Sequence, residues 1–220
     1  MKQLFDLYCS KLDGLKSLHN TLGPSENYDG PFLMCEPPIN FKELENRLLI
    51  IGQETNGWSG DLIVDSVDTI RKNMDLYRAF GYGEKYNSTF FQYARNIARS
   101  VSGQQIFMWT NLNKFGKASG AGRPCKNVID NETSHFNILI DEIQIVDPTN
   151  IVFLTGPNYD DLIIDRIHGS KIEAVGGFTL REFARVFIPT IKAQAYRLYH
   201  PGYGNRISKR YLECIHHLTR

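Results

Sequence analysis

The protein has 220 residues, of which 42% are hydrophobic and 12% are aromatic, and this content suffices for the core of one domain. Because no apolar run approaches the roughly 20 residues that span a bilayer and the first residues lack a signal-peptide core, we expect a cytoplasmic protein with no membrane partner. The formal net charge of +1 favours neither an acidic nor a basic partner.

In chain order, the pattern predicts a helix over residues 2–20 and then irregular structure, rich in Pro, Gly and Asn, over residues 23–40. Four short apolar runs follow, and their near-continuous apolarity favours strands buried on both faces. These runs are residues 47–51, 105–110, 150–155 and 195–199. Apolar residues at helical spacing predict the intervening helices, with helix starts near Ser88 and Asn131. They cover residues 63–77, 90–101, 136–146 and 207–218.

Strands that alternate with helices, joined by connections long enough for crossovers, predict a parallel sheet covered on both sides. We therefore expect one α/β domain with a three-layer α/β/α fold and a central four-stranded parallel sheet. Residues 1–46 form its N-terminal helix and irregular lead-in, and residues 47–220 form the core. Ligands of such sheets bind beyond the carboxyl ends of the strands. Function is therefore expected in the loops that begin near Gly52, Asn111, Gly156 and His200.

The loop after the first strand places a carboxylate, two amides and an indole between two glycines, which allow a sharp turn and a close approach of a ligand. In a purely structural interpretation, Glu54 caps the next helix and Trp58 is simply buried. So many polar groups at the mouth of a buried strand favour a binding role instead. The candidates here are Gly52, Gln53, Glu54, Asn56 and Trp58.

Two other loops carry candidate residues. Asn111 follows the second strand, and its amide offers both the donor and the acceptor that reading a base edge requires, although an Asn that bonds only to loop backbone fits equally well. The fourth strand leads into His200, Pro201 and a glycine-containing turn. Arg206 then stands at an expected helix start, where free backbone N–H groups favour anions.

The last 40 residues are basic. Residues 181–220 hold eight Lys or Arg against Glu182 and Glu213, a net charge of +6 within a chain whose formal charge is +1. The segment is either a solvated helix face or a contact with nucleic-acid phosphates.

The cysteines lack the C-x-x-C spacing of zinc, iron-sulfur or redox sites. They are Cys9, Cys35, Cys125 and Cys214. We expect reduced thiols, no metal ion and no cofactor.

Together these motifs resemble the uracil-DNA glycosylase superfamily. The sequence Gly52-Gln53-Glu54 is similar to the start of that family's first motif, of the type G-Q-D-P-Y or G-E-A-P-G. Asn111 resembles the Asn that reads the base. The segment from Tyr199 to Arg206 is similar to the Y-H-P-S-Y-L-L-R of the thermostable bacterial branch. The sequence departs from the family at Thr55, where Pro is usual, and at Gly202, where Ser is usual. It also lacks the leucine wedge and the iron-sulfur cysteines.

The resemblance implies cleavage of the N-glycosidic bond of uracil or another damaged base in DNA, as a monomer active in base-excision repair. It assigns catalysis to Glu54 and His200. From the resemblance, together with the chemistry of the loops and of the basic segment, we assign substrate binding to Gly52, Gln53, Asn56, Trp58, Asn111 and Tyr203, and phosphate binding to Arg206, Lys209 and Arg210. A non-catalytic nucleic-acid-binding protein and a small-molecule nucleoside or glycoside hydrolase remain as alternatives.

Overall fold

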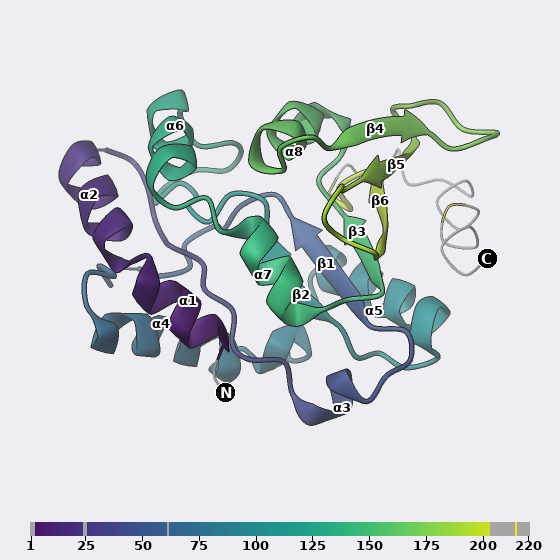
Figure 1. Cartoon of the computed structure of the whole chain (residues 1–220), viewed down its shortest axis with the longest axis horizontal. Helices are drawn as coiled ribbons and strands as arrows, with labels where there is room; N and C mark the ends of the chain where they lie inside the picture. Colours follow the sequence, from purple (N-terminus) through teal and green to yellow (C-terminus); the bar gives the residue numbers. More distant parts are fainter. Residues whose placement is uncertain (1–2, 24–25, 61, 203–213, 215–220) are drawn as a thin grey trace.

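The computed structural model describes residues 3–23, 26–60, 62–202 and 214. Its centre is a six-stranded sheet with the strand order β2-β1-β3-β6-β5-β4 (Figure 1). The strands are β1 (Leu48–Gly52), β2 (Met108–Asn111), β3 (Asn150–Phe153), β4 (Lys171–Ala174), β5 (Phe183–Phe187) and β6 (Gln194–Leu198). The four predicted runs correspond to β1, β2, β3 and β6, which are neighbours and mutually parallel.

The predicted number of four strands is wrong, because β4 and β5 extend the sheet in antiparallel orientation. Neither of these strands is an apolar run. β5 alternates buried and exposed residues over part of its length, and β4 is an exposed edge strand in which Lys171 and Glu173 face solvent. Such strands are buried on one face at most, so a search for continuous apolarity misses them.

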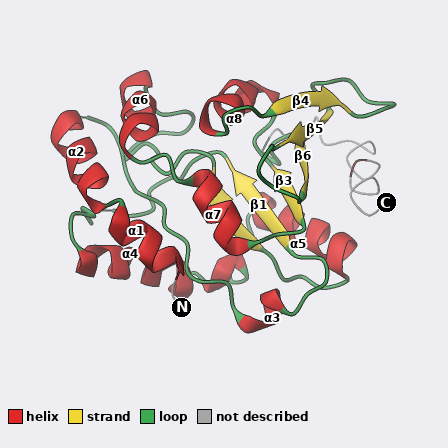
Figure 2. Cartoon of the chain, viewed as in Figure 1, coloured by secondary structure: helices red, strands yellow, loops and turns green. Residues whose placement is uncertain are grey.

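Helices flank the sheet on both sides (Figure 2). The helical elements are α1 (Gln3–Ser10), α2 (Leu12–Leu22), α3 (Ile39–Lys42), α4 (Val67–Ala79), η1 (Gly81–Gly83), α5 (Thr89–Ser102), α6 (Lys126–His135), α7 (Leu139–Val146), η2 (Pro157–Tyr159) and α8 (Asp160–Arg166). None of the described helices is long and apolar enough to span a membrane.

Some helix boundaries differ from the prediction. The expected first helix is two helices, because the chain leaves helical geometry at Lys11. Ser88 is the N-cap of α5, as predicted. Asn131 is not a helix start, since it lies inside α6, and α7 begins only after a break at residues 136–138. The predicted helix over residues 207–218 lies outside the described residues, except that Cys214 is helical and buried.

The two faces of the sheet are covered by different helices, which gives an α/β/α arrangement. The side chain of Trp109 in β2 packs against Tyr77 of α4 and Phe91 of α5. The next residue, Thr110, points to the opposite face and donates a hydrogen bond to Glu142 of α7. Figure 1 shows α7 in front of the sheet and α5 behind it. Side chains on the Trp109 face of β2 therefore point toward α4 and α5.

Candidate functional site

A cavity of about 450 Å³ opens at the carboxyl ends of β1, β2 and β6, on the side of the sheet covered by α4 and α5. Three different strands contribute to it because their parallel alignment brings their ends to one edge, with Gly52 directly opposite Asn111 in the register of β1 and β2. The cavity is lined by Gly52, Gln53, Glu54, Thr55, Asn56, Gly57, Trp58, Phe80, Ser88, Phe90, Phe91, Trp109, Asn111 and His200. All candidate residues from the first two loops and His200 thus meet in one place.

The Glu54 carboxylate is half-buried and held by two neighbours. The Tyr159 hydroxyl lies 2.7 Å from Oε1 and 2.9 Å from Oε2, and the Asn113 amide donates to Oε2 at 3.3 Å. Burial raises the pKa of Glu54, and the hydrogen bonds from Tyr159 and Asn113 act against that rise. Glu54 does not cap the next helix, because that role belongs to Ser66 at the start of α4. Glu54 lines the cavity instead.

Asn111 is buried at the end of β2 and lines the cavity. Its side chain lies where a larger residue at position 52 would be: a Cβ added to Gly52 would lie 2.4 Å from Asn111 Oδ1. Glycine at position 52 is thus required for this placement of the amide. In the described part of the chain, no hydrogen bond occupies the Asn111 side chain, whereas its backbone oxygen accepts one from Lys114 at 3.0 Å. The amide can present a donor and an acceptor to a ligand.

His200 is held in a defined tautomer. Its Nδ1 lies 3.0 Å from the backbone nitrogen of Gly202, which can only donate, so Nδ1 accepts and Nε2 carries the proton of the neutral ring. Burial lowers the pKa of His200, which favours this neutral form. The imidazole stacks on Phe90 with ring centres 6.0 Å apart and planes at 27°. The Nε2–H group of His200 is therefore a hydrogen-bond donor in a cavity whose wall is largely aromatic.

Aromatic rings form the cavity wall. They belong to Trp58, Phe80, Phe90, Phe91 and Trp109. Trp58 is fixed on several sides: its ring centre lies 4.7 Å from that of Phe32, and its indole nitrogen donates to Asn73 at 3.3 Å. Phe90 instead lies beside His200, partly exposed. A planar ligand that reaches His200 will therefore lie close to the ring of Phe90.

The loop that carries Glu54 is clamped by two other segments. The buried Asp29 carboxylate accepts the backbone N–H of Trp58 and, at 3.0 Å, that of Ser59. Gly116 pairs with Asp29 through two backbone hydrogen bonds and passes so close to Thr55 that an added Cβ would lie 2.0 Å from its carbonyl oxygen. The loop is thus a rigid part of the fold.

Two buried ion pairs lie next to the loop that follows β2. Lys114 pairs with Glu142 of α7, and its ammonium also donates to Thr110 at 2.5 Å. Arg166 of α8 pairs with Glu132 of α6 at 3.2 Å. All four charged side chains are at most 2% exposed. Buried pairs are costly unless their geometry is well satisfied, and here they fix the backbone that presents Asn111.

Four sequence candidates lie outside the described residues. They are Tyr203, Arg206, Lys209 and Arg210. Among the described cations, Arg123 and Arg181 converge on the loop after β3, where both bond to Asn158. Lys117 follows Gly116 in a segment that clamps the Glu54 loop, and its charge and that of Arg123 act on Glu54. In the described residues, no group of three or more His, Cys, Asp or Glu side chains is arranged to hold a metal ion.

Several residues of the site were not predicted from the sequence. Phe90 stands at the start of the helix predicted over residues 90–101, where an aromatic residue that packs on the sheet is ordinary. Asn113 is two residues from Asn111, in a loop in which only one Asn was considered. Tyr159 lies in the loop after β3, which begins near Gly156 and contains no recognised motif. Trp109 was detectable, because residues two apart in a strand share a face and Trp109 is two residues before Asn111.

Comparison with known proteins identifies neither a family model nor a curated protein that matches this sequence.

Proposed function

We propose that this protein is a DNA N-glycosylase of the uracil-DNA glycosylase type, which hydrolyses the bond between a damaged base and its deoxyribose in base-excision repair. The observation that carries this proposal is the convergence of Glu54, Asn111 and His200, from the ends of β1, β2 and β6, on one aromatic-walled cavity. These are the three positions at which the sequence resembles the family's motifs. The volume of about 450 Å³ lies within the range of about 300–1,000 Å³ that is typical of small-ligand sites.

The chemistry requires stabilisation of charge at both ends of the breaking bond. As the bond breaks, positive charge develops on the sugar and negative charge on the departing base. The Glu54 carboxylate stabilises the first and orients the attacking water, and the Nε2–H of His200 donates to the base oxygen on which the second accumulates. Preorganised donors directed at developing charge are usually the largest catalytic contribution.

The base must leave the helical stack to reach this cavity, as in other enzymes that act on bases in DNA. Inside the cavity, the Asn111 amide reads the base edge and the Phe90 ring stacks on the base. Arg206, Lys209 and Arg210 then hold the flanking phosphates, a role to which the described cations Lys117 and Arg181 contribute from the other loops of this edge.

The decisive experiment is incubation of the purified protein with oligonucleotides that carry uracil, hypoxanthine or other lesions, followed by alkaline cleavage at abasic sites. We expect strand cleavage with at least one lesion. The variant Glu54→Gln should lose base release by at least about 100-fold while its DNA affinity stays the same or rises slightly, since a negative charge near phosphates has been removed.

The same experiment separates the alternatives. DNA binding that depends on salt, without release of any base, would identify a non-catalytic binding protein. Hydrolysis of free nucleosides, without affinity for DNA, would identify a small-molecule hydrolase.

A further inference from the structure

The orientation of the Glu54 carboxylate is set by side chains from two other elements. The Tyr159 hydroxyl bridges both carboxylate oxygens, at 2.7 and 2.9 Å, from the end of η2. The Asn113 amide donates to Oε2 at 3.3 Å from the loop after β2. A flexible glutamate on a loop is thereby restricted to one arrangement relative to the cavity that it lines.

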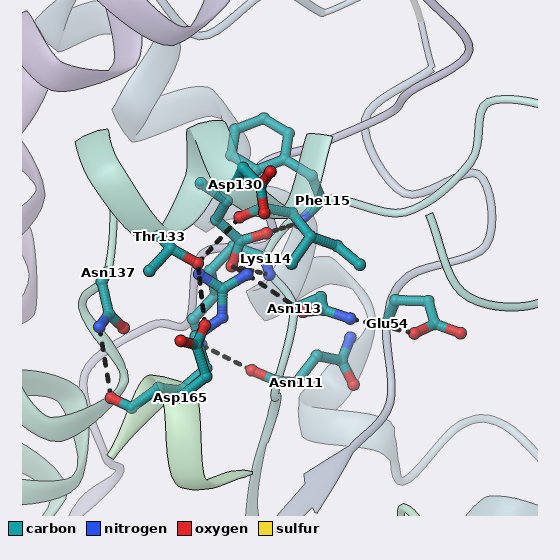
Figure 3. Close-up of polar contacts among 12 residues, drawn as sticks. Glu54, Asn111, Asn113, Lys114, Phe115, Asp130, Thr133, Asn137 and Asp165 are labelled. Carbon is teal, nitrogen blue, oxygen red and sulfur yellow. Dashed lines mark hydrogen bonds and ion pairs between the residues drawn. The ribbon is translucent and has the colours of Figure 1, made fainter. Parts of the chain in front are cut away.

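The amide of Asn113 can face Glu54 in only one way. Its Oδ1 accepts a hydrogen bond from Arg166 Nη2 at 3.2 Å, and a guanidinium group has only donors. The amide NH₂ must therefore face Glu54. Arg166 is itself fixed by its ion pair with Glu132, whose carboxylate also accepts the backbone N–H of Lys114 at 2.8 Å (Figure 3). The buried Arg166–Glu132 ion pair therefore fixes the orientation of the Asn113 amide, so that its NH₂ group donates to Glu54.

Tyr159 is anchored just as firmly. The Arg123 guanidinium lies over its ring, 4.6 Å from the ring centre, and is itself held by Asp161 through two hydrogen bonds of 2.9 Å. Tyr159 is only 5% exposed. Its hydroxyl thus reaches Glu54 from a ring that is packed and covered, so the two oxygen contacts do not depend on a mobile side chain.

We propose that Tyr159 and Asn113 are positioning residues, which hold the Glu54 carboxylate in the orientation that the reaction needs by donating hydrogen bonds to its oxygens. This inference rests on the proposed role of Glu54 in base release. Both donors favour the ionised carboxylate, and they oppose the effect of burial, which raises the pKa of Glu54. Without them, Glu54 would become neutral at a higher pH and would lose its fixed direction.

The test measures the ionisation of Glu54 directly, so that it does not depend on activity. The side-chain carboxyl carbons of uniformly ¹³C-labelled protein are titrated by NMR, and the Glu54 signal is assigned by its loss in Glu54→Gln. In Tyr159→Phe, which keeps the ring beneath Arg123 and removes only the hydroxyl, the midpoint of the Glu54 titration should move to higher pH. The matched control is Tyr196→Phe, which removes a hydroxyl bonded to Gln194 at 3.2 Å and should leave the Glu54 midpoint unchanged.

A second variant tests the Asn113 arm. Asn113→Ala removes the amide that donates to Glu54 and adds no charge beside its carboxylate. The Glu54 midpoint should again move to higher pH. In both variants base release should fall roughly 10-fold to 100-fold in kcat, with little change in KM, and should partly recover as the pH is raised.

The outcomes separate this inference from the proposed function. If Tyr159→Phe and Asn113→Ala fold normally and the Glu54 midpoint stays where it is in the unmodified protein, the positioning role is refuted, whatever the activity. If the unmodified protein releases no base from any lesion, the glycosylase proposal fails, and with it the role of Tyr159 and Asn113 in catalysis. A shifted midpoint in the variants would still show that the two residues donate hydrogen bonds to the Glu54 carboxylate.

Discussion

Gly52 and Asn111 stand opposite each other at the ends of two parallel strands, and the side chain of Asn111 occupies the space that a Cβ at position 52 would need. A Cβ at position 52 would lie 2.4 Å from Asn111 Oδ1 and 3.3 Å from the ring of Phe90. The first distance is too short for a contact, so the Asn111 side chain would have to move. The absence of a side chain at position 52 thus determines where the amide in the cavity can lie.

The first prediction follows from this relationship. Gly52→Ala should leave the fold intact but displace the Asn111 amide, and base release should fall by roughly 100-fold, as is common for a displacement of about 1 Å at a reacting centre. Single-turnover cleavage of a lesion-containing oligonucleotide measures the effect. Gly176→Ala is the matched control, because nothing lies within 4 Å of its added Cβ. Normal activity in Gly52→Ala would show that the placement of Asn111 is not needed.

The sequence allowed the parallel part of the fold to be predicted for a physical reason. β1, β2, β3 and β6 are buried on both faces or nearly so, and continuous apolarity is a signal that a single sequence carries. The β4–β5 hairpin is half-exposed and gives only a weak alternation. Once four parallel strands were assigned, Gly52, Asn111 and His200 followed at their ends, because chain direction alone puts those ends together.

The supporting residues were not predictable in this way, because their roles depend on contacts between distant parts of the chain. Asn113 and Arg166 are separated by 53 positions, and Glu54 and Tyr159 by 105. No periodicity or short motif records such a pair. From sequence alone, a charged residue in a helix is expected to be solvated, and only the packing of α6 and α8 shows that Arg166 and Glu132 are buried partners.

The second prediction concerns pH. Glu54 acts as an anion, and burial raises its pKa above the ordinary value of 4.5; His200 acts as a neutral donor, and burial lowers its pKa below 6.5. A pKa below 6.5 leaves His200 neutral at pH 7, and the proposed role of Glu54 requires its ionised form. Base release should therefore be constant around pH 7 and fall on acidification, as Glu54 gains a proton and His200 becomes charged. A pH–rate profile measures this, and a rate that rises below about pH 6 would mean that the imidazolium is the active form.

The third prediction concerns stability. Glu142→Gln leaves the buried ammonium of Lys114 without its counter-charge and should lower the free energy of unfolding by about 3–5 kcal/mol. Urea denaturation measures this change. The double variant Lys114→Met with Glu142→Gln should be less destabilised than the sum of the single variants, because no unpaired charge remains. Additive effects would show that the two residues do not stabilise each other.

The last prediction concerns DNA. Lys209 and Arg210 lie outside the described residues and are assigned to phosphates from the sequence; Lys117 and Arg181 lie on described loops at the carboxyl edge of the parallel strands. A Lys or Arg that neutralises a phosphate releases counterions when DNA binds, and it keeps this contact in the transition state. Such a residue therefore contributes to affinity rather than to the rate of the bound complex. Replacing either pair with Ala should therefore weaken binding and reduce the slope of log affinity against log salt by about 0.7 to 0.9 for each phosphate that is no longer neutralised. Base release at saturating DNA should change little.

Binding measured across a salt series checks this prediction for both pairs. The control replaces Lys16 and Lys42, which are exposed on α2 and α3, do not line the cavity and should leave the slope unchanged. If the Lys209 and Arg210 variant behaves like this control, the basic C-terminal segment is a solvated face. If only the Lys117 and Arg181 variant changes the slope, the DNA backbone follows the loops after β2 and β4 instead.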